Sequence, residues 1–134
     1  MTYSRKSVYT YIRNAIVASH SGAYVTARRE PIPKNFPAVW VTEMNRTRPQ
    51  QYATLANDDQ QYESTFEAQI FSNKQNGALE EAYSILDTVE SAFKTLGYFE
   101  TFCDQVDNAD PSVFRIVARF SRQIGMADVM PSTT

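Results

Sequence analysis

The sequence has few of the residues that usually mark chemistry. Its 134 residues include one cysteine, Cys103, one histidine, His20, and four glycines. A single cysteine cannot form a disulfide within the chain, which fits a reducing compartment. The glycines form neither the GxGxxG nor the GxxxxGK[ST] pattern that cradles phosphate groups, and no GxSxG turn presents a serine nucleophile. These absences exclude the common enzyme classes that carry such motifs.

The lone histidine and cysteine do not suggest a catalytic centre. A general base needs a nucleophile and an orienting partner, and His20 stands between two serines at the predicted end of a helix. Cys103 lies close to Glu100 and Asp104, whose charges would raise the pKa of its thiol rather than lower it. The carboxylates do not follow the spacing of a metal site. We therefore expect no catalytic residue, no cofactor and no metal, and expect that the protein is not an enzyme.

The charge and hydropathy of the chain limit its partners. With 13 basic and 15 acidic residues the net charge is −2, whereas a general nucleic-acid binder is usually basic. No run of about eighteen apolar residues is present to span a membrane. The 43% hydrophobic content is enough for a core without disulfides. We expect one domain over residues 1–129 with a flexible tail over residues 130–134, and no contact with membranes or with specific nucleic-acid sequences.

The clearest predicted element is a helix over residues 77–96. Its apolar residues recur every three or four positions, as on the buried side of an amphipathic helix. Asn76 is a suitable N-cap, and Gly97 can end the helix in a left-handed conformation. The predicted buried stripe consists of Leu79, Ala82, Tyr83, Leu86, Val89, Phe93 and Leu96.

The other segments predict a second helix and a sheet. Residues 4–20 place apolar side chains at helical spacing. Phe66, Ala68 and Ile70 alternate with Glu67 and Gln69, which indicates a strand with one buried and one wet face. The strands are expected over residues 23–28, 38–46, 61–72, 98–106 and 113–122. The resulting fold class is α+β in the order α-β-β-β-α-β-β, with the long helix packed across an antiparallel sheet beside the N-terminal helix.

A long polar segment and several arginines are the candidate contact residues. Residues 47–60 join two strands of a predicted hairpin, and long loops of this kind are often functional. We expect this segment to order against a partner through Arg46, Arg48 and Tyr52. Arg115 and Arg119 share one face of the last strand. They either pair with acidic residues across the strands or contact another subunit.

The segment from Phe66 to Phe120 resembles a known family. It contains the phrase FEAQIFSNK, a helix that ends TLGY, and the strand SVFRIVARF. This pattern is similar to the small neck proteins of long-tailed bacteriophages, known as tail-terminator, tail-completion or minor capsid proteins. Phe71 and Phe114 stand where tyrosines are common in that family.

The resemblance implies a structural virion protein made in the cytoplasm of the bacterial host. Members of the family form a ring, usually a hexamer, at the head-proximal end of the tail. The implied partners are other copies of the chain, the tail-tube protein and the head connector. The residues by themselves leave open a terminator or a neighbouring head-completion role. They also leave open a small-molecule binding domain or an unrecognised enzyme, either of which needs a concave pocket.

Overall fold

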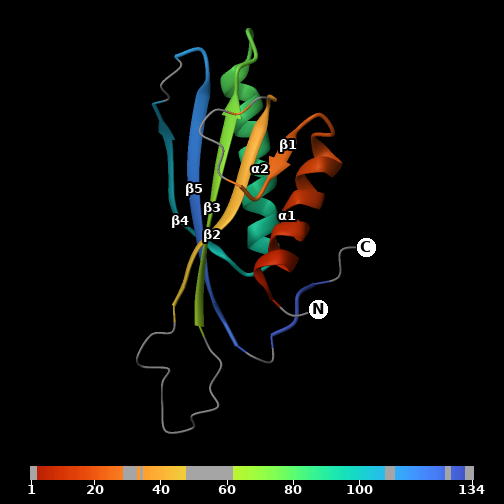
Figure 1. The fold of residues 1–134 in the computed structure, drawn as a ribbon, viewed down its shortest axis with the longest axis vertical. Helices are drawn as coiled ribbons and strands as arrows, with labels where there is room; N and C mark the ends of the chain where they lie inside the picture. The colour runs from red at the N-terminus through yellow and green to blue at the C-terminus, as the bar shows by residue number, and fades with distance from the viewer. Residues whose placement is uncertain are drawn as a thin grey trace, which may run out of the picture.

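A computed structural model describes residues 3–28, 33, 35–47, 62–107, 111–125 and 128–131. This part of the chain contains two helices and a sheet, in the order α-β-β-β-α-β-β (Figure 1). The α+β class and this order confirm the expectation from the sequence. The elements are α1 (Arg5–Ser19), β1 (Tyr24–Thr26), β2 (Ala38–Thr47), β3 (Tyr62–Ser72), α2 (Ala78–Thr95), β4 (Phe99–Val106) and β5 (Phe114–Ile124).

The sheet is mixed rather than wholly antiparallel. Its five described strands lie in the order β1-β2-β3-β5-β4, and every neighbouring pair is antiparallel except the first. β1 runs parallel to β2, with Tyr24 opposite Ala38. The prediction of an antiparallel sheet is therefore wrong at this edge. The proline-containing segment between these strands is a crossover and not a hairpin, because both strands run the same way.

The first helix begins at a reciprocal cap. Ser4 Oγ accepts a hydrogen bond from the Ser7 amide at 3.0 Å, and Ser7 Oγ accepts one from the Ser4 amide at 2.9 Å. This arrangement satisfies two amides at the start of the helix. The buried residues of α1 are Val8, Ile12 and Ile16, which recur at helical spacing, whereas Ala15 is half-buried and Ser19 is exposed.

The second helix buries a different arc from the one predicted. Leu79 and Tyr83 are 39% and 42% exposed, so their assignment to the buried stripe is wrong. Ile85 and Ala92, which the stripe omitted, are buried instead. The buried arc is rotated toward the side of α2 that meets α1. The buried residues of the helix are Ala78, Ala82, Ile85, Leu86, Val89, Ala92 and Phe93.

The ends of α2 depend on two glycines. The N-cap is Gly77, in a left-handed conformation with φ of 92°, and not Asn76 as predicted. Glu80 and Glu81 lie in the first turn, where carboxylates favour the positive end of the helix dipole. Gly97 has φ of 85° and reverses the chain after the helix, as the sequence predicted.

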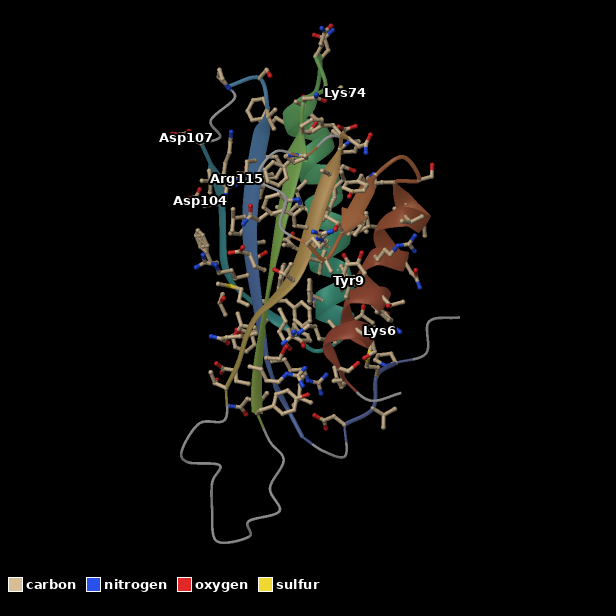
Figure 2. All side chains as sticks on the ribbon, in the orientation of Figure 1. Lys6, Tyr9, Lys74, Asp104, Asp107 and Arg115 are labelled. Atoms are coloured by element: carbon tan, nitrogen blue, oxygen red, sulfur yellow. The ribbon has the colours of Figure 1, made fainter. Side chains whose placement is uncertain are left out.

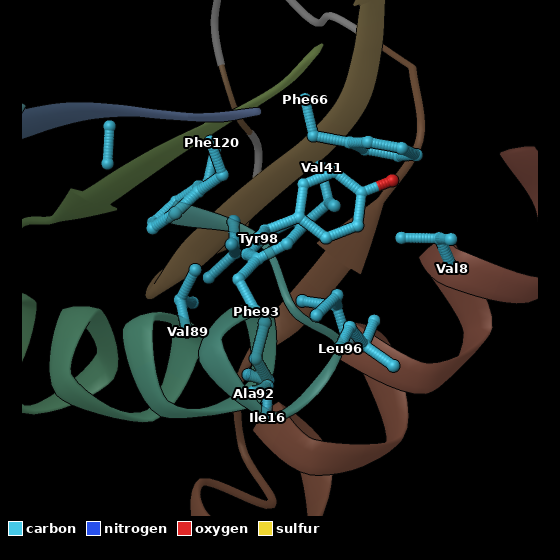
Figure 3. Close-up of a cluster of buried hydrophobic side chains, with 14 of the residues drawn as sticks. Val8, Ile16, Val41, Phe66, Val89, Ala92, Phe93, Leu96, Tyr98 and Phe120 are labelled. Carbon is cyan, nitrogen blue, oxygen red and sulfur yellow. The ribbon is translucent and has the colours of Figure 1, made fainter. Parts of the chain in front are cut away.

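The core lies between the two helices and one face of the sheet, and an aromatic cluster occupies its centre (Figure 3). Phe93 of α2 stacks on Phe120 of β5 with ring centroids 4.4 Å apart. Tyr98 meets Phe93 and Phe66 edge to face, at 5.2 and 5.8 Å. These contacts join the end of α2 to the two central strands.

The chain packs against the core again after β5. Asp128 Oδ2 accepts hydrogen bonds from the Gly125 amide at 2.8 Å and from Arg122 Nη2 at 3.2 Å. Met130 is 6% exposed and belongs to the main core cluster. The core thus includes Met130, which the sequence placed in a tail, whereas residues 132–134 lie outside the described residues.

Candidate functional site

One face of the sheet is not covered by either helix. Side chains alternate between the two faces of a strand. Phe66, Ala68 and Ile70 of β3 pack in the core with the helices, so Glu67 and Gln69 lie on the opposite face. We call this surface the open face. Across the paired strands it comprises Trp40, Thr42, Glu67, Gln69, Phe71, Phe102, Arg115, Val117 and Arg119.

A ladder of polar side chains runs across the open face. Arg119 Nε donates to Glu67 Oε2 at 3.0 Å, and Gln69 Nε2 donates to Glu67 Oε1 at 2.8 Å. Arg115 Nε then donates to Gln69 Oε1 at 3.1 Å. The ladder joins β3 to β5. Each hydrogen bond to the carboxylate is charge-assisted and therefore stronger than a neutral one.

The ladder bears on the two interpretations of these residues. Glu67 and Gln69 are only 4% and 6% exposed, so the prediction that they face solvent is wrong. The long side chains of the neighbouring strands cover them. The pairing of Arg119 with Glu67 confirms cross-strand pairing within the chain for this arginine. A contact of Arg115 or Arg119 with another subunit stays a prediction.

A shallow groove of about 320 Å³ lies over this ladder. Arg119 Cζ lies 5.0 Å from the ring centroid of Phe102, and Met44 is 39% exposed at the edge of the groove. Arginine, methionine and phenylalanine are enriched in protein interfaces. The groove is lined by Met44, Glu67, Gln69, Phe102, Val106, Arg115, Val117 and Arg119.

A small aromatic cluster occupies the other end of the open face. Trp40 and Phe71 have ring centroids 4.8 Å apart and pack with Ala38 and Val113. The indole Nε1 of Trp40 is buried without a hydrogen-bond partner in the described structure. A buried N–H without a partner costs about 1–3 kcal/mol, so this cluster holds Trp40 by packing alone.

Arg46 lies on the other face of the sheet from Arg115 and Arg119. A bulge between Glu43 and Asn45 in β2 changes which face the following residues occupy. Arg46 is opposite Ser64 on the helix side of the sheet, and its Nη2 lies 2.9 Å from Glu43 Oε2. Its guanidinium also lies 4.2 Å from the centroid of the Tyr62 ring. Arg48, Tyr52 and most of the predicted 47–60 loop lie outside the described residues.

Glu43 is a buried carboxylate that no sequence signal marks. Its side chain is fully buried and accepts hydrogen bonds from Arg5 Nε at 3.2 Å, from Arg46 and from Ser64 Oγ at 2.7 Å. Tyr98 Oη donates to the same serine at 3.1 Å, and burial raises the pKa of Tyr98 to about 12. This network links the start of α1 to β2 and β3. Its partners are all within the chain, which indicates a structural role.

His20 has a partner on the second helix. Its Nε2 lies 3.3 Å from Thr88 Oγ1, across the two helices. A groove of about 630 Å³ lies beside this contact. Its lining is small and polar, and it includes Tyr11, Asn14, Ala15, Ala18, Ser19, Asp87, Thr88, Ser91, Ala92 and Thr95. The contact between His20 and Thr88 therefore connects the end of α1 to α2, which is a structural role.

The structure brings together Glu90, Glu100 and Cys103, which lie on two different elements. One ligand atom from each lies within 4.8 Å of the others. A hydrogen bond to Glu100, together with burial, raises the pKa of Glu90 to about 7. Partial burial and the charges of Glu100, Glu90 and Asp104 raise the pKa of the Cys103 thiol to about 11. The thiol is thus far from the reactive range, in the direction that the sequence predicted.

Comparisons with known proteins do not identify a family. No model of a known protein family matches the sequence, and a search of curated proteins finds no similar chain. Within the described residues, no helix combines the length and apolar character needed to cross a membrane.

Proposed function

We propose that this chain is a structural protein of a bacteriophage virion that closes the head-proximal end of the tail. In this role copies of the chain form a ring, a hexamer in the resembling family, which stops growth of the tail tube and joins the tail to the head connector. The observation that carries the proposal is the open face of the sheet, which presents apolar and arginine side chains around a shallow groove.

The phrases that resemble the neck proteins support the proposal by their positions. The phrase FEAQIFSNK covers the end of β3, the TLGY phrase ends α2, and the third phrase forms most of β5. Together they supply Phe66, Tyr98 and Phe120 to the core. They also supply the Arg119–Glu67 pair to the open face. The similarity thus covers both the residues that hold the fold and those that line the candidate contact surface.

The open face suits a protein partner more than a small ligand. Its arginines are held by Glu67 and Gln69, so their positions are fixed before binding, which lowers the entropy cost of association. Phe102 and Met44 offer apolar contact beside them. Tail-tube or connector protein is the partner that the proposal assigns to this surface.

Deletion and complementation of the gene in its phage or prophage test the proposal. We expect loss of the protein to give tails of irregular length or heads without tails, as seen by electron microscopy. A Met44→Ala/Phe102→Ala variant keeps its fold but fails to restore normal tails, because the apolar part of the groove is removed. Tyr83→Ala, an exposed aromatic on α2, is the matched control and restores them. Normal particles without the protein would refute the proposal.

The groove between the helices favours a second candidate, a small-molecule binding domain. Its volume of about 630 Å³ falls within the range of ligand pockets. A variant that fills the groove, Ala18→Trp, separates the two functions. If the groove has no role in assembly, the variant still supports tail assembly. If the protein instead binds a small molecule there, a ligand should stabilise the parent protein and not the variant, which would favour the second candidate.

A further inference from the structure

Two segments of the described chain carry opposite charge. Residues 3–28, which form α1 and β1, contain Arg5, Lys6, Arg13 and Arg28 and no acidic residue. Residues 99–107, which form β4 and the residue after it, contain Glu100, Asp104 and Asp107 and no lysine or arginine. We call these two surfaces the basic flank and the acidic flank. The net charge of the whole chain, −2, does not reflect this separation, because basic and acidic residues nearly cancel in the sum.

The two flanks lie on opposite sides of the molecule. β1 and β4 are the two edges of the sheet, and α1 packs beside β1 and β2. Figure 2 shows Lys6 on α1 at one side of the molecule, and Asp104 on β4 with Asp107 just after it at the other. A contact that joins the flanks therefore cannot form within one copy of the chain.

Most of these charges are not neutralised by neighbours. Lys6, Arg13 and Arg28 are exposed and form no ion pair with a described acidic residue. Arg5 pairs with Glu43, although its side chain is 75% exposed. Three of the four charges of the basic flank thus remain available to a partner.

The acidic flank has no described ion pair, although Lys94 lines a groove with Glu100, and the Arg119 guanidinium lies over Phe102 of β4. Glu100, Asp104 and Asp107 are exposed, and none forms an ion pair with a described basic residue. A hydrogen bond to Glu100 is the main cause of the raised pKa of Glu90, burial is the main cause of the raised pKa of Cys103, and the negative charge of Glu100 contributes to both. A basic partner would relieve this repulsion.

We propose that the basic flank of one copy binds the acidic flank of the next copy, so that subunits join head to tail. This inference deepens the proposed ring and rests on it. A contact between two different patches of one chain repeats from copy to copy, and it closes into a ring when the rotation per subunit allows. Opposite potentials fix the register of such a contact and speed its formation.

The acidic flank offers more than charge to the neighbouring copy. β4 is an edge strand, so one side of its backbone has hydrogen-bonding groups that are not paired within the sheet. Phe99 at its start is 61% exposed, the most exposed aromatic among the large apolar residues that stand out on the surface. An apolar contact at Phe99, surrounded by ion pairs, has the core-and-rim arrangement of protein interfaces.

Charge reversal in two complementary variants tests the inference. Lys6→Glu/Arg13→Glu gives a chain with two acidic flanks, and Asp104→Lys/Asp107→Lys gives a chain with two basic flanks. Sedimentation velocity in 0.05 M and 0.5 M salt measures self-association, and circular dichroism checks the fold. Lys74→Glu, at the exposed turn between β3 and α2, is the control for a charge change outside both flanks.

The parent protein should self-associate, and more strongly at low salt because surface charge is screened at high salt. Each double variant should self-associate on the order of 100-fold more weakly, because like charges then meet. An equimolar mixture of the two variants should restore association, since each flank again meets its opposite. Lys74→Glu should behave as the parent does.

Three results would overturn the inference. Unchanged assembly of either double variant, or failure of the mixture to assemble, would show that the contact lies on another surface. Neither result would contradict the proposed ring itself. A parent protein that stays monomeric at millimolar concentration and low salt would exclude this contact, and the tail-length experiment would then decide the proposed function separately. If a charge reversal unfolds the chain, the neutral variants Lys6→Gln/Arg13→Gln and Asp104→Asn/Asp107→Asn take its place. Each must then lower the logarithm of the association constant by about half as much as the reversal is expected to.

Discussion

Two aromatic residues of α2 allow a sharp test of the fold. The helical spacing of the sequence assigns both Tyr83 and Phe93 to one buried stripe. In the structure Phe93 is fully buried and Tyr83 is 42% exposed. The substitutions Phe93→Ala and Tyr83→Ala remove side chains of similar size from the same helix, so any difference between them reports burial and not helix propensity.

The expected magnitudes follow from the contacts. Phe93 stacks on Phe120 at 4.4 Å and meets Tyr98 and Phe66 at 5.2 and 5.8 Å, so its removal leaves a cavity that these rings cannot fill. Phe93→Ala should lower the free energy of unfolding by about 3–5 kcal/mol, as for other buried phenylalanines. For a chain of this size that loss corresponds to a fall in Tm of about 10–20 °C. Tyr83→Ala should change the stability by about 0.5 kcal/mol or less.

Urea unfolding followed by circular dichroism measures both changes. The slope of the unfolding free energy against urea should stay the same in the two variants, because neither changes the surface exposed on unfolding by much. Equal losses in the two variants would show that the helix buries the stripe predicted from the sequence. A loss below about 1 kcal/mol for Phe93→Ala would refute the packing of the aromatic cluster altogether.

Four further predictions concern the polar groups. Arg119→Ala should lower the free energy of unfolding by about 1–3 kcal/mol because it removes a charge-assisted hydrogen bond from the buried Glu67 carboxylate. Adding Glu67→Gln should cost less than the sum of the two changes, whereas additive losses would show that the ladder is not coupled. The pKa of Glu90 is raised to about 7 from an ordinary value of 4.5, so the folded state binds the proton more tightly, and stability should fall as the pH rises from 4.5 to 7. That fall should disappear in Glu90→Gln, and an identical pH profile in this variant would contradict the assignment. Cys103, with its pKa raised to about 11, should react with iodoacetamide at pH 7.5 more slowly than an unfolded peptide thiol, and Glu100→Gln should increase the rate; equal rates for protein and peptide would be inconsistent with the negative surroundings. Dialysis against a chelator should leave Tm unchanged, and a drop that one metal ion reverses would assign a metal site to Glu90, Glu100 and Cys103.

Local sequence patterns determined which elements form. The alternation of β5 assigned Arg115 and Arg119 to one face of the strand, and the structure places Ile116, Ala118 and Phe120 of the other face in the core, whereas Phe114 on that face is only half-buried. This prediction succeeded because successive side chains of a strand point to opposite faces, so the face of one residue determines the faces of the others. The end of α2 at Gly97 was predictable for a similar reason, since its left-handed conformation is a local preference of glycine.

Only the tertiary structure decided which side of each element is covered. The periodicity of α2 fixes an apolar side but not the centre of its buried arc, because Ile85 is as apolar as Leu79 and Ala92 adds a further apolar position on the other side of the stripe. The position of α1 beside one side of the helix buries Ala92, while Leu79 and Tyr83 face a side that no other described helix covers. Helix rotation is thus set by the neighbours and not by the helix itself.

The same dependence on neighbours explains the open face. In a regular strand Arg46 would lie on the same face as Trp40, because side chains alternate and an even number of positions separates the two residues. The bulge between Glu43 and Asn45 shifts this alternation and places Arg46 on the helix side. Alternation correctly assigned Glu67 to the face opposite the core, but it did not show that this side chain is buried and accepts a hydrogen bond from Arg119, which lies 52 residues away in the sequence. The sequence by itself therefore determined the elements and the faces of their residues, whereas contacts between distant strands and helices decided which of those faces water can reach.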